Sequence, residues 1–284
     1  MRMQLRHDPT YFVATRCLPR ERRSAVHALY GYVRGADEIA DDQRRNGERR
    51  AALDAWQAEL EHGLERGHSE HPIIAALVDA GPRHGMPLEL IPQYMDSMRA
   101  DCDDPVRMRS QDQLERYMDG TATVGPLIAP LLDAPAGVDG LLASLGVAFQ
   151  LTNFIRDIGE DHGRGRIYLP QADLARFGVS EDLLARAVHT GVPSPPVRSL
   201  VAFEVRRAVD LYVTARPGLT MVDSRSQPCL ELAFTLYRRI LHRVISNDFN
   251  VFQARLAVPR WQRLAAAGHV AARAAGARAG LRTY

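Results

Sequence analysis

The sequence of 284 residues lacks lysine, has only three cysteines and contains no long uncharged stretch. All of its 36 basic residues are arginine, and they nearly balance 34 acidic residues to leave a net charge of +2. Nucleic-acid binders usually carry a basic excess or a clustered basic stripe, so nucleic acid is not an expected partner. Hydrophobic residues form 46% of the chain, which is too many for an intrinsically disordered protein.

The cysteines and the amino terminus indicate a compartment. Cys17, Cys102 and Cys229 are odd in number, far apart and without a CxxC pair, which favours a reducing cytoplasm over a disulfide framework. The amino terminus is polar and charged, unlike a signal peptide. The longest uncharged runs, 120–132 and 140–155, fall short of the ~20 apolar residues of a membrane span. We therefore expect a soluble cytoplasmic protein, with peripheral membrane contact left open.

Apolar residues recur at a spacing near 3.6 along most of the chain, which predicts helices, and no strand alternation stands out. The expected helices lie at about 20–42, 48–62, 87–100, 110–132 with a bend at 120–125, 138–161, 171–177, 180–189, 198–215 and 228–247. No repeat or linker divides the sequence, so we predict one all-α domain over residues 1–284. The Ala- and Arg-rich residues 260–284 are expected to form a solvated terminal helix or tail.

Two acidic helix faces are the main chemical feature. Asp37 and Asp41 are four residues apart, so their carboxylates project from one helical face about one turn apart. Tyr30 and Arg34 continue the same stripe. A second stripe lies on the most apolar expected helix and comprises Gln150, Asn153, Asp157 and Asp161.

A lone acidic pair is usually a solvated surface, but carboxylates and amides on a buried stripe need partners. Two facing carboxylate clusters suit Mg²⁺, which takes oxygen ligands and typically binds one or two carboxylates plus substrate phosphates. Nearby arginines would hold the remaining oxygens of a diphosphate through forked hydrogen bonds; they are Arg34, Arg156, Arg166 and Arg255. The absence of GxGxxG and GxxxxGK[ST] argues against a nucleotide loop, and the absence of HExxH argues against a zinc enzyme.

These residues resemble the two signatures of the squalene and phytoene synthase family. One is Asp37-x-x-x-Asp41 after Tyr30, and the other runs from Gln150 through Asp161 into the stretch RGRIYLP at 164–170. Residues 7–19, 233–241 and 249–255 match further family stretches, so the resemblance covers most of the chain. It implies a single all-helical isoprenoid-synthase domain around a deep central cavity.

The resemblance also implies a reaction and the residues for it. Diphosphate would leave an allylic prenyl donor with the help of two or three Mg²⁺ ions, which stabilise the leaving oxygens. The implied metal ligands are Asp37, Asp41, Asn153, Asp157 and Asp161. The implied contacts to the diphosphate or the carbocation are Tyr30, Arg34, Gln150, Asn153, Arg156, Arg166, Tyr237, Arg255 and His7. The four aspartates, Tyr30 and Tyr237 are the expected catalytic residues, and Phe12, Tyr117 and Thr121 are the expected acceptor pocket.

The acceptor side departs from the family pattern, which leaves alternatives open. The segment 117–125 is one residue shorter than the family's Gly/Ala/Val-rich break, and Arg107-Met108 stands where an Arg-Tyr pair is expected. The leading hypothesis is head-to-head condensation of two prenyl diphosphates to a squalene- or phytoene-like hydrocarbon. The alternative is transfer of a short prenyl group, such as dimethylallyl, to an aromatic acceptor such as a carbazole in secondary metabolism. A non-catalytic assembly protein would have no need for the four aspartates.

Other properties stay open at this level. NADPH is not expected, because no dinucleotide fingerprint occurs, but family reductases also lack that motif and a reductive step remains undecided. The donor chain length depends on which side chains form the cavity floor. Both a monomer and a homodimer are compatible with the sequence.

Overall fold

The computed structural model describes residues 14–45, 47–103, 105–253, 256, 258–259, 261–263, 265–268 and 270. No strand occurs among these residues, and their extended pairing is an isolated parallel bridge between Arg107 and Ile167. The predicted all-α class is therefore confirmed. None of the described helices is long and apolar enough to cross a membrane.

The helices follow the sequence periodicity closely. In chain order they are α3 (Arg20–Asp41), α4 (Arg49–Arg66), α5 (Pro72–Arg83), α6 (Ile91–Ala100), α7 (Gln111–Ala122), α8 (Val124–Ile128), α9 (Asp139–Gly163), α10 (Gln171–Arg176), α11 (Glu181–Thr190), α12 (Pro195–Ala215), α13 (Gly218–Met221) and α14 (Gln227–Ser246). Short 3-10 turns occupy Gln43–Arg45, Leu88–Leu90 and Ala129–Leu132. Helices α5 and α13 are not among those expected from the sequence, although Pro72 in the first turn of α5 is a recognised start signal.

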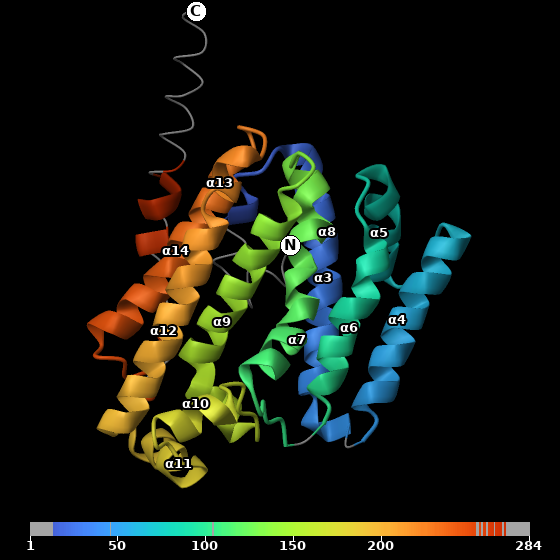
Figure 1. The fold of residues 1–284 in the computed structure, drawn as a ribbon. Coiled ribbons are helices and arrows are strands. Elements are labelled where there is room, and N and C mark those ends of the chain that lie inside the picture. Colours follow the sequence, from blue (N-terminus) through green and yellow to red (C-terminus); the bar gives the residue numbers. More distant parts are fainter. Residues whose placement is uncertain are drawn as a thin grey trace, which may run out of the picture.

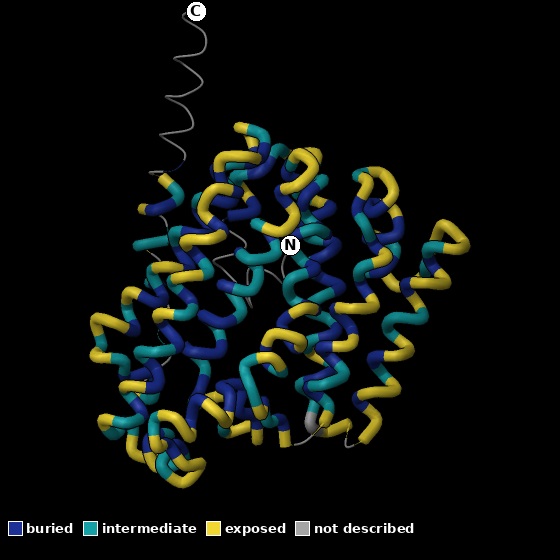
Figure 2. Tube along the Cα trace, in the orientation of Figure 1, coloured by how far each residue is buried: buried dark blue, intermediate teal, exposed yellow. Residues whose placement is uncertain are grey.

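The long helix α9 runs through the middle of the bundle (Figure 1). It contacts α12 and α14 on one side and α7 and α8 on the other, while α4 and α5 form the far edge beyond α3. Its buried apolar residues belong to one continuous core, and Figure 2 shows that burial concentrates on the inward faces of the helices. A stripe of polar residues on α9 is thereby placed inside the molecule.

The helix that begins after Ser110 has the predicted cap and the predicted bend. Ser110 Oγ accepts a hydrogen bond from the Gln113 backbone N–H at 3.2 Å, and Gln113 Oε1 accepts one from the backbone N–H of Arg109 at 2.7 Å. The bend separates α7 from α8, and its glycines allow close packing. A Cβ on Gly120 would lie 2.2 Å from Ser97 Oγ, and one on Gly125 would lie 2.4 Å from the α9 backbone.

Candidate active site

A cavity of about 540 Å³ lies between α3 and α9 and brings the two acidic faces together. Its other walls come from α6, α7, α14 and the segment after α9. The predicted residues that line it are Tyr30, Arg34, Asp37, Asp41, Tyr117, Gln150, Asn153, Arg156, Asp157, Asp161, Arg166 and Tyr237. His7, Phe12 and Arg255 lie outside the described residues.

Thr121 has a different position from the rest of the predicted set. It lies one turn beyond Tyr117 on α7, and it is not among the residues that line the cavity. Its carbonyl oxygen faces α9, where a Cβ on Gly146 would be 3.1 Å away. In this structure Thr121 therefore lies at the contact between α7 and α9.

On the α3 face, arginines neutralise the carboxylates. Asp41 Oδ1 accepts a hydrogen bond from Arg166 Nη1 at 2.5 Å, and Asp37 Oδ2 accepts one from Arg34 Nη1 at 3.3 Å. Arg166 also donates through Nη2 to the backbone carbonyls of Ala40 at 3.0 Å and Asp101 at 3.2 Å. Its side chain is only 6% exposed, so Arg166 fixes the end of α3 to the loop after α6.

The α9 face also carries two aspartates and an arginine, but here the arginine pairs with its neighbour in the sequence. Arg156 donates through Nε and Nη2 to the two carboxylate oxygens of the adjacent Asp157, at 2.8 and 2.5 Å. Burial raises the pKa of Asp161 to about 7, and the charge of Asp157 adds to the rise. On the opposite face, burial raises the pKa of Asp37 to about 7, where the charges of Arg34 and Asp41 act in opposite directions. Each face thus contains one carboxylate whose charged form is disfavoured by burial, Asp37 on α3 and Asp161 on α9.

The chemistry of these side chains fits Mg²⁺. The Oδ1 atom of Asn153 is buried on the α9 stripe and has no hydrogen-bond partner among the described residues. A divalent cation beside Asn153 would bind this oxygen as a ligand. Its charge would also favour the charged forms of Asp37 and Asp161. Within the described part of the chain, no three His, Cys, Asp or Glu side chains are already gathered for a metal ion. Binding would therefore require the aspartates to exchange arginine partners for the cation.

Asp101 and Tyr168 line the cavity but are not among the site residues predicted from the sequence. The Tyr117 hydroxyl donates to Asp101 Oδ2 at 2.8 Å, and the Tyr168 hydroxyl donates to Oδ1 at 2.8 Å. Asp101 is 6% exposed, and burial raises its pKa while Arg166 opposes the rise. A buried carboxylate with two tyrosine donors fixes both rings at the cavity wall.

Aromatic rings separate this polar cavity from an apolar pocket. Tyr237 lines the polar cavity, and its ring stacks on Phe149 with a centroid distance of 4.2 Å. Phe149 lines a second pocket of about 80 Å³ between α3, α8, α9 and α14, whose walls are almost entirely apolar. Two further rings of the polar cavity's lining, Phe154 and Tyr168, stack on each other at a centroid distance of 4.1 Å. The arrangement provides charged groups at one end and a hydrocarbon environment at the other.

Arg107 and Met108 stand where an Arg-Tyr pair was expected. They are not among the residues that line the cavity, and they hold two segments together. Arg107 donates through Nε and Nη2 to both carboxylate oxygens of Glu181, at 2.8 and 2.9 Å. Its Nη1 also donates to the backbone carbonyl of Gly165 at 2.6 Å. Met108 is 3% exposed, and its backbone N–H donates to the Ile167 carbonyl at 3.4 Å. This pair therefore anchors the segment that carries Arg166 and Tyr168.

The squalene/phytoene synthase family model matches residues 5–262, which include both acidic stripes. The chain belongs to this family. Its members are prenyltransferases. The chain is 34% identical over 266 residues to the chloroplastic phytoene synthase of Narcissus pseudonarcissus, which covers 90% of this chain and 61% of that protein. It is 32% identical over 273 residues to the 15-cis-phytoene synthase of Synechococcus elongatus, covering 91% of this chain and 87% of that protein.

Solved structures agree on the fold. A dehydrosqualene synthase in complex with a ligand superposes with a TM-score of 0.84 at 24% identity, covering 99% of this chain and 95% of the other. A squalene synthase, HpnC from Alicyclobacillus acidocaldarius, gives a TM-score of 0.77 at 27% identity, covering 88% and 92%. The expected isoprenoid-synthase fold is therefore confirmed.

Proposed function

We propose that the chain is a Mg²⁺-dependent prenyltransferase that ionises an allylic prenyl diphosphate and condenses it head to head with a second one. The observation that carries this proposal is the convergence of the two acidic stripes and their arginines on one cavity. The product would be a squalene- or phytoene-like hydrocarbon. The relatives named phytoene synthase, at 32–34% identity, favour this acceptor over an aromatic one.

The metal would be held by the oxygens of Asp37, Asp41, Asn153, Asp157 and Asp161. When bound, Mg²⁺ stabilises the negative charge that develops on the leaving diphosphate oxygens. Arg34, Arg156 and Arg166 would then donate forked hydrogen bonds to the diphosphate. In this structure each of these arginines is paired with an aspartate, so metal and diphosphate together would satisfy both sets of charges.

The rest of the cavity would protect the allylic cation. Tyr237, Phe154 and Tyr168 line the polar cavity, and an aromatic ring whose face is turned to a cation stabilises it by about 0.5–2 kcal/mol. The apolar pocket behind Phe149 would receive hydrocarbon and exclude water from the cation. Asp101 would hold the hydroxyls of Tyr117 and Tyr168 in fixed positions at the reacting end.

One observation favours transfer of a short prenyl group as the second candidate. A cavity needs a volume of roughly 10–15 Å³ to hold one water-sized group. The 80 Å³ of the apolar pocket therefore accommodates about six such groups. That room is closer to a dimethylallyl tail than to a C15 tail, so an aromatic acceptor with a C5 donor is the alternative to test.

The test is incubation of the purified protein with Mg²⁺ and C5, C15 or C20 allylic diphosphates, with release of diphosphate and extracted products measured. We expect diphosphate release and a C30 or C40 hydrocarbon from a C15 or C20 donor alone. Turnover that requires an added aromatic acceptor would replace condensation with acceptor prenylation. Absence of diphosphate release from every donor would overturn the prenyltransferase proposal.

A further inference from the structure

The chain turns back on itself directly after α14, in a backbone conformation that needs support. Asp248 and Phe249 have φ angles of 51° and 56°, in the left-handed region that residues with a Cβ seldom adopt. Such a conformation is costly, and it persists only where the surrounding contacts hold it. The contacts around residues 247–250 therefore determine whether this turn keeps its shape.

Asn250 holds the turn from inside the molecule. It is 6% exposed, and its Nδ2 donates to the backbone carbonyl of Gly191, at the end of α11, at 3.0 Å. Its Oδ1 accepts a hydrogen bond from the backbone N–H of Phe252 at 3.0 Å, and its backbone carbonyl accepts one from Asn247 Nδ2 at 2.5 Å. Both polar atoms of this buried side chain are therefore paired, and they connect the turn to α11 and to the residues that follow it.

Arg198 of α12 holds the exposed side of the same turn. Its Nη1 donates to the backbone carbonyl of Asp248 at 2.7 Å and also pairs with the Asp248 carboxylate. The Asp248 side chain is 80% exposed, so water and salt weaken this ion pair. The buried amide of Asn250 is therefore the stronger constraint on the turn.

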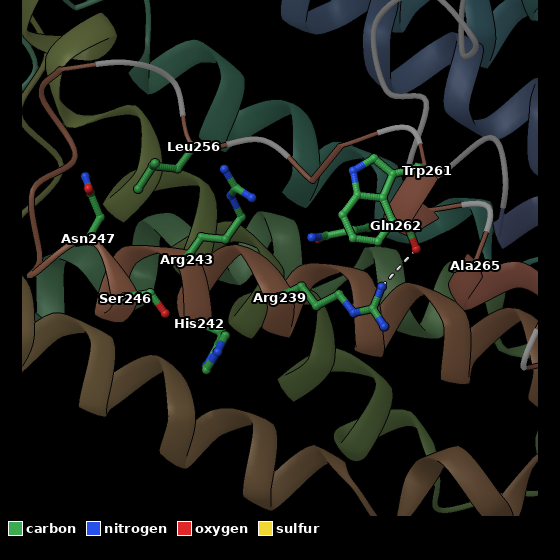
Figure 3. Close-up of a pocket in the computed structure, with 9 residues that line it drawn as sticks. All are labelled: Arg239, His242, Arg243, Ser246, Asn247, Leu256, Trp261, Gln262 and Ala265. Carbon is green, nitrogen blue, oxygen red and sulfur yellow. Dashed lines mark hydrogen bonds between the residues drawn. The ribbon is translucent and has the colours of Figure 1, made fainter.

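The return segment, which comprises the described residues 251–253, 256, 258–259 and 261–263, leads from this turn back along α14. Its far end is fixed to the middle of that helix, because Arg239 Nη1 donates to the backbone carbonyl of Gln262 at 2.9 Å (Figure 3). Figure 3 also shows Leu256 and Trp261 beside α14. The turn and the bond between Arg239 and Gln262 thus hold the return segment at its two ends.

A cavity of about 590 Å³ lies between α14 and the return segment. Arg243 and Ser246 line it from α14, whereas Leu256 and Trp261 line it from the segment. Close packing usually fixes the position of a segment on a helix, and here the cavity interrupts that packing. The position of the return segment therefore depends on the hydrogen bonds at its ends.

The return segment also forms part of the wall of the candidate active site. Val258 and Arg263 line that cavity together with Tyr237 and Ile240 of α14. Val258 is 3% exposed and contributes apolar surface, while Arg263 contributes a positive charge. A shift of the segment along α14 would therefore change both the shape and the charge of the cavity.

We propose that Asn250 is a positioning residue for the candidate active site, because the turn that it holds places Val258 and Arg263 in the cavity wall. Asn250 does not itself line the cavity. The inference rests on the proposed function, since the expected effect is on the binding of a prenyl diphosphate. Val258 and Arg263 would contact the substrate before as well as during ionisation, so misplacing them weakens binding and leaves the chemical step nearly unchanged.

The kinetic test compares Asn250→Ala with Ser69→Ala in the full chain. Ser69 lies at the far edge of the bundle, and its Oγ accepts a hydrogen bond from the backbone N–H of His71 at 3.0 Å. Each variant therefore loses a bond of the same length to the residue two positions on. We expect Asn250→Ala to raise KM for the allylic diphosphate about ten-fold with kcat within about two-fold, and Ser69→Ala to keep both constants.

A milder variant keeps the test usable if Asn250→Ala folds poorly. Asn247→Ala removes only the side chain that donates to the Asn250 carbonyl, and it should raise KM about three-fold. A fall in kcat at constant KM would indicate a smaller folded fraction and would overturn the positioning role. Unchanged constants in both variants would overturn it as well.

Hydrogen exchange without substrate distinguishes this inference from the proposed function. In Asn250→Ala, residues 251–263 should exchange about ten-fold faster or more, while α3 and α9 exchange at the parent rate. Ser69→Ala should leave 251–263 unchanged. Unchanged exchange at 251–263, or faster exchange throughout the bundle, would overturn the role of Asn250. A parent protein that releases no diphosphate would overturn the proposed function, and faster exchange confined to 251–263 would still support the placement of this segment by Asn250.

Discussion

The two acidic faces of the cavity have matching chemistry but are held in different ways. On α3, Asp41 is paired at 2.5 Å with Arg166, which lies 125 residues further along the chain. On α9, Asp157 is paired with the adjacent Arg156 at 2.8 and 2.5 Å. The α3 face therefore depends on the tertiary fold, whereas the α9 face is organised within one core helix.

The other carboxylate on each face, Asp37 on α3 and Asp161 on α9, has the same property. Asp37 and Asp161 have pKa values raised to about 7, chiefly by burial. A cation between the faces would favour the charged form of both. The faces should therefore be equally necessary for a metal-dependent reaction, even though they differ in how strongly they depend on the rest of the fold.

The largest expected effect tests this equality. Asp37→Asn and Asp157→Asn should each lower Mg²⁺-dependent diphosphate release about 10³-fold, because either change removes a charged oxygen from the proposed metal site. The measurement is single-turnover release of diphosphate at saturating Mg²⁺. Asp210→Asn, on the exposed side of α12, is the control and should keep the parent rate. A large loss on one face only would contradict an equal role for both.

The next effect tests the difference between the faces. Arg166→Gln should lower the free energy of unfolding by about 3 kcal/mol, because it removes a guanidinium that is 6% exposed and that holds Asp41 together with the backbone carbonyls of Ala40 and Asp101. Arg156→Gln should cost about 1 kcal/mol, since Asp157 lies on a helix that the core already fixes. Urea unfolding monitored by circular dichroism measures both. Equal losses would show that the α9 pairing is as structural as the α3 pairing.

A smaller effect separates positioning from binding at Asp101. Asp101→Asn should lower kcat about ten-fold with little change in KM, because an amide offers one acceptor oxygen where the carboxylate serves two tyrosine hydroxyls. Tyr168→Phe removes one of these donors and should reproduce part of the loss. Steady-state kinetics with the preferred donor measures both constants. A rise in KM at constant kcat would instead assign Asp101 to substrate binding.

The sequence predicts the two acidic stripes of this site much better than it predicts Asp101 and its tyrosine partners. The two stripes can be recognised because helical spacing places Asp37 with Asp41, and Asp157 with Asp161, whatever the tertiary structure is. Their convergence on one cavity followed from family resemblance, since spacing alone does not say which helices face each other. Asp101 had no local signal, because its tyrosine partners lie 16 and 67 residues away and its loop has no periodicity.

The helices of the fold also differ in how well local sequence patterns predict them. The bend between α7 and α8 was predicted from its glycines. A larger residue at these positions would clash with Ser97 or Leu142, which are distant in the sequence, so only the packed structure shows why glycine is needed. The apolar helix α5 was missed because its short segment, Pro72–Arg83, ends in a Gly-Pro pair that is typical of a turn. Local patterns thus predict elements, and long-range pairs decide how the elements form a site.

The smallest expected effect comes from the second arginine that contacts Asp41. Arg164 donates to Asp41 Oδ2 at 3.4 Å and to Glu160 Oε1 at 2.8 Å, so it connects the two faces directly. Its side chain is 39% exposed, and exposed ion pairs contribute little because water and salt screen them. Arg164→Gln should therefore cost only about 0.5 kcal/mol in urea unfolding, and 0.5 M NaCl should abolish the difference. The loss in Arg166→Gln should persist at that salt concentration, because burial rather than proximity to Asp41 makes Arg166 the structural link.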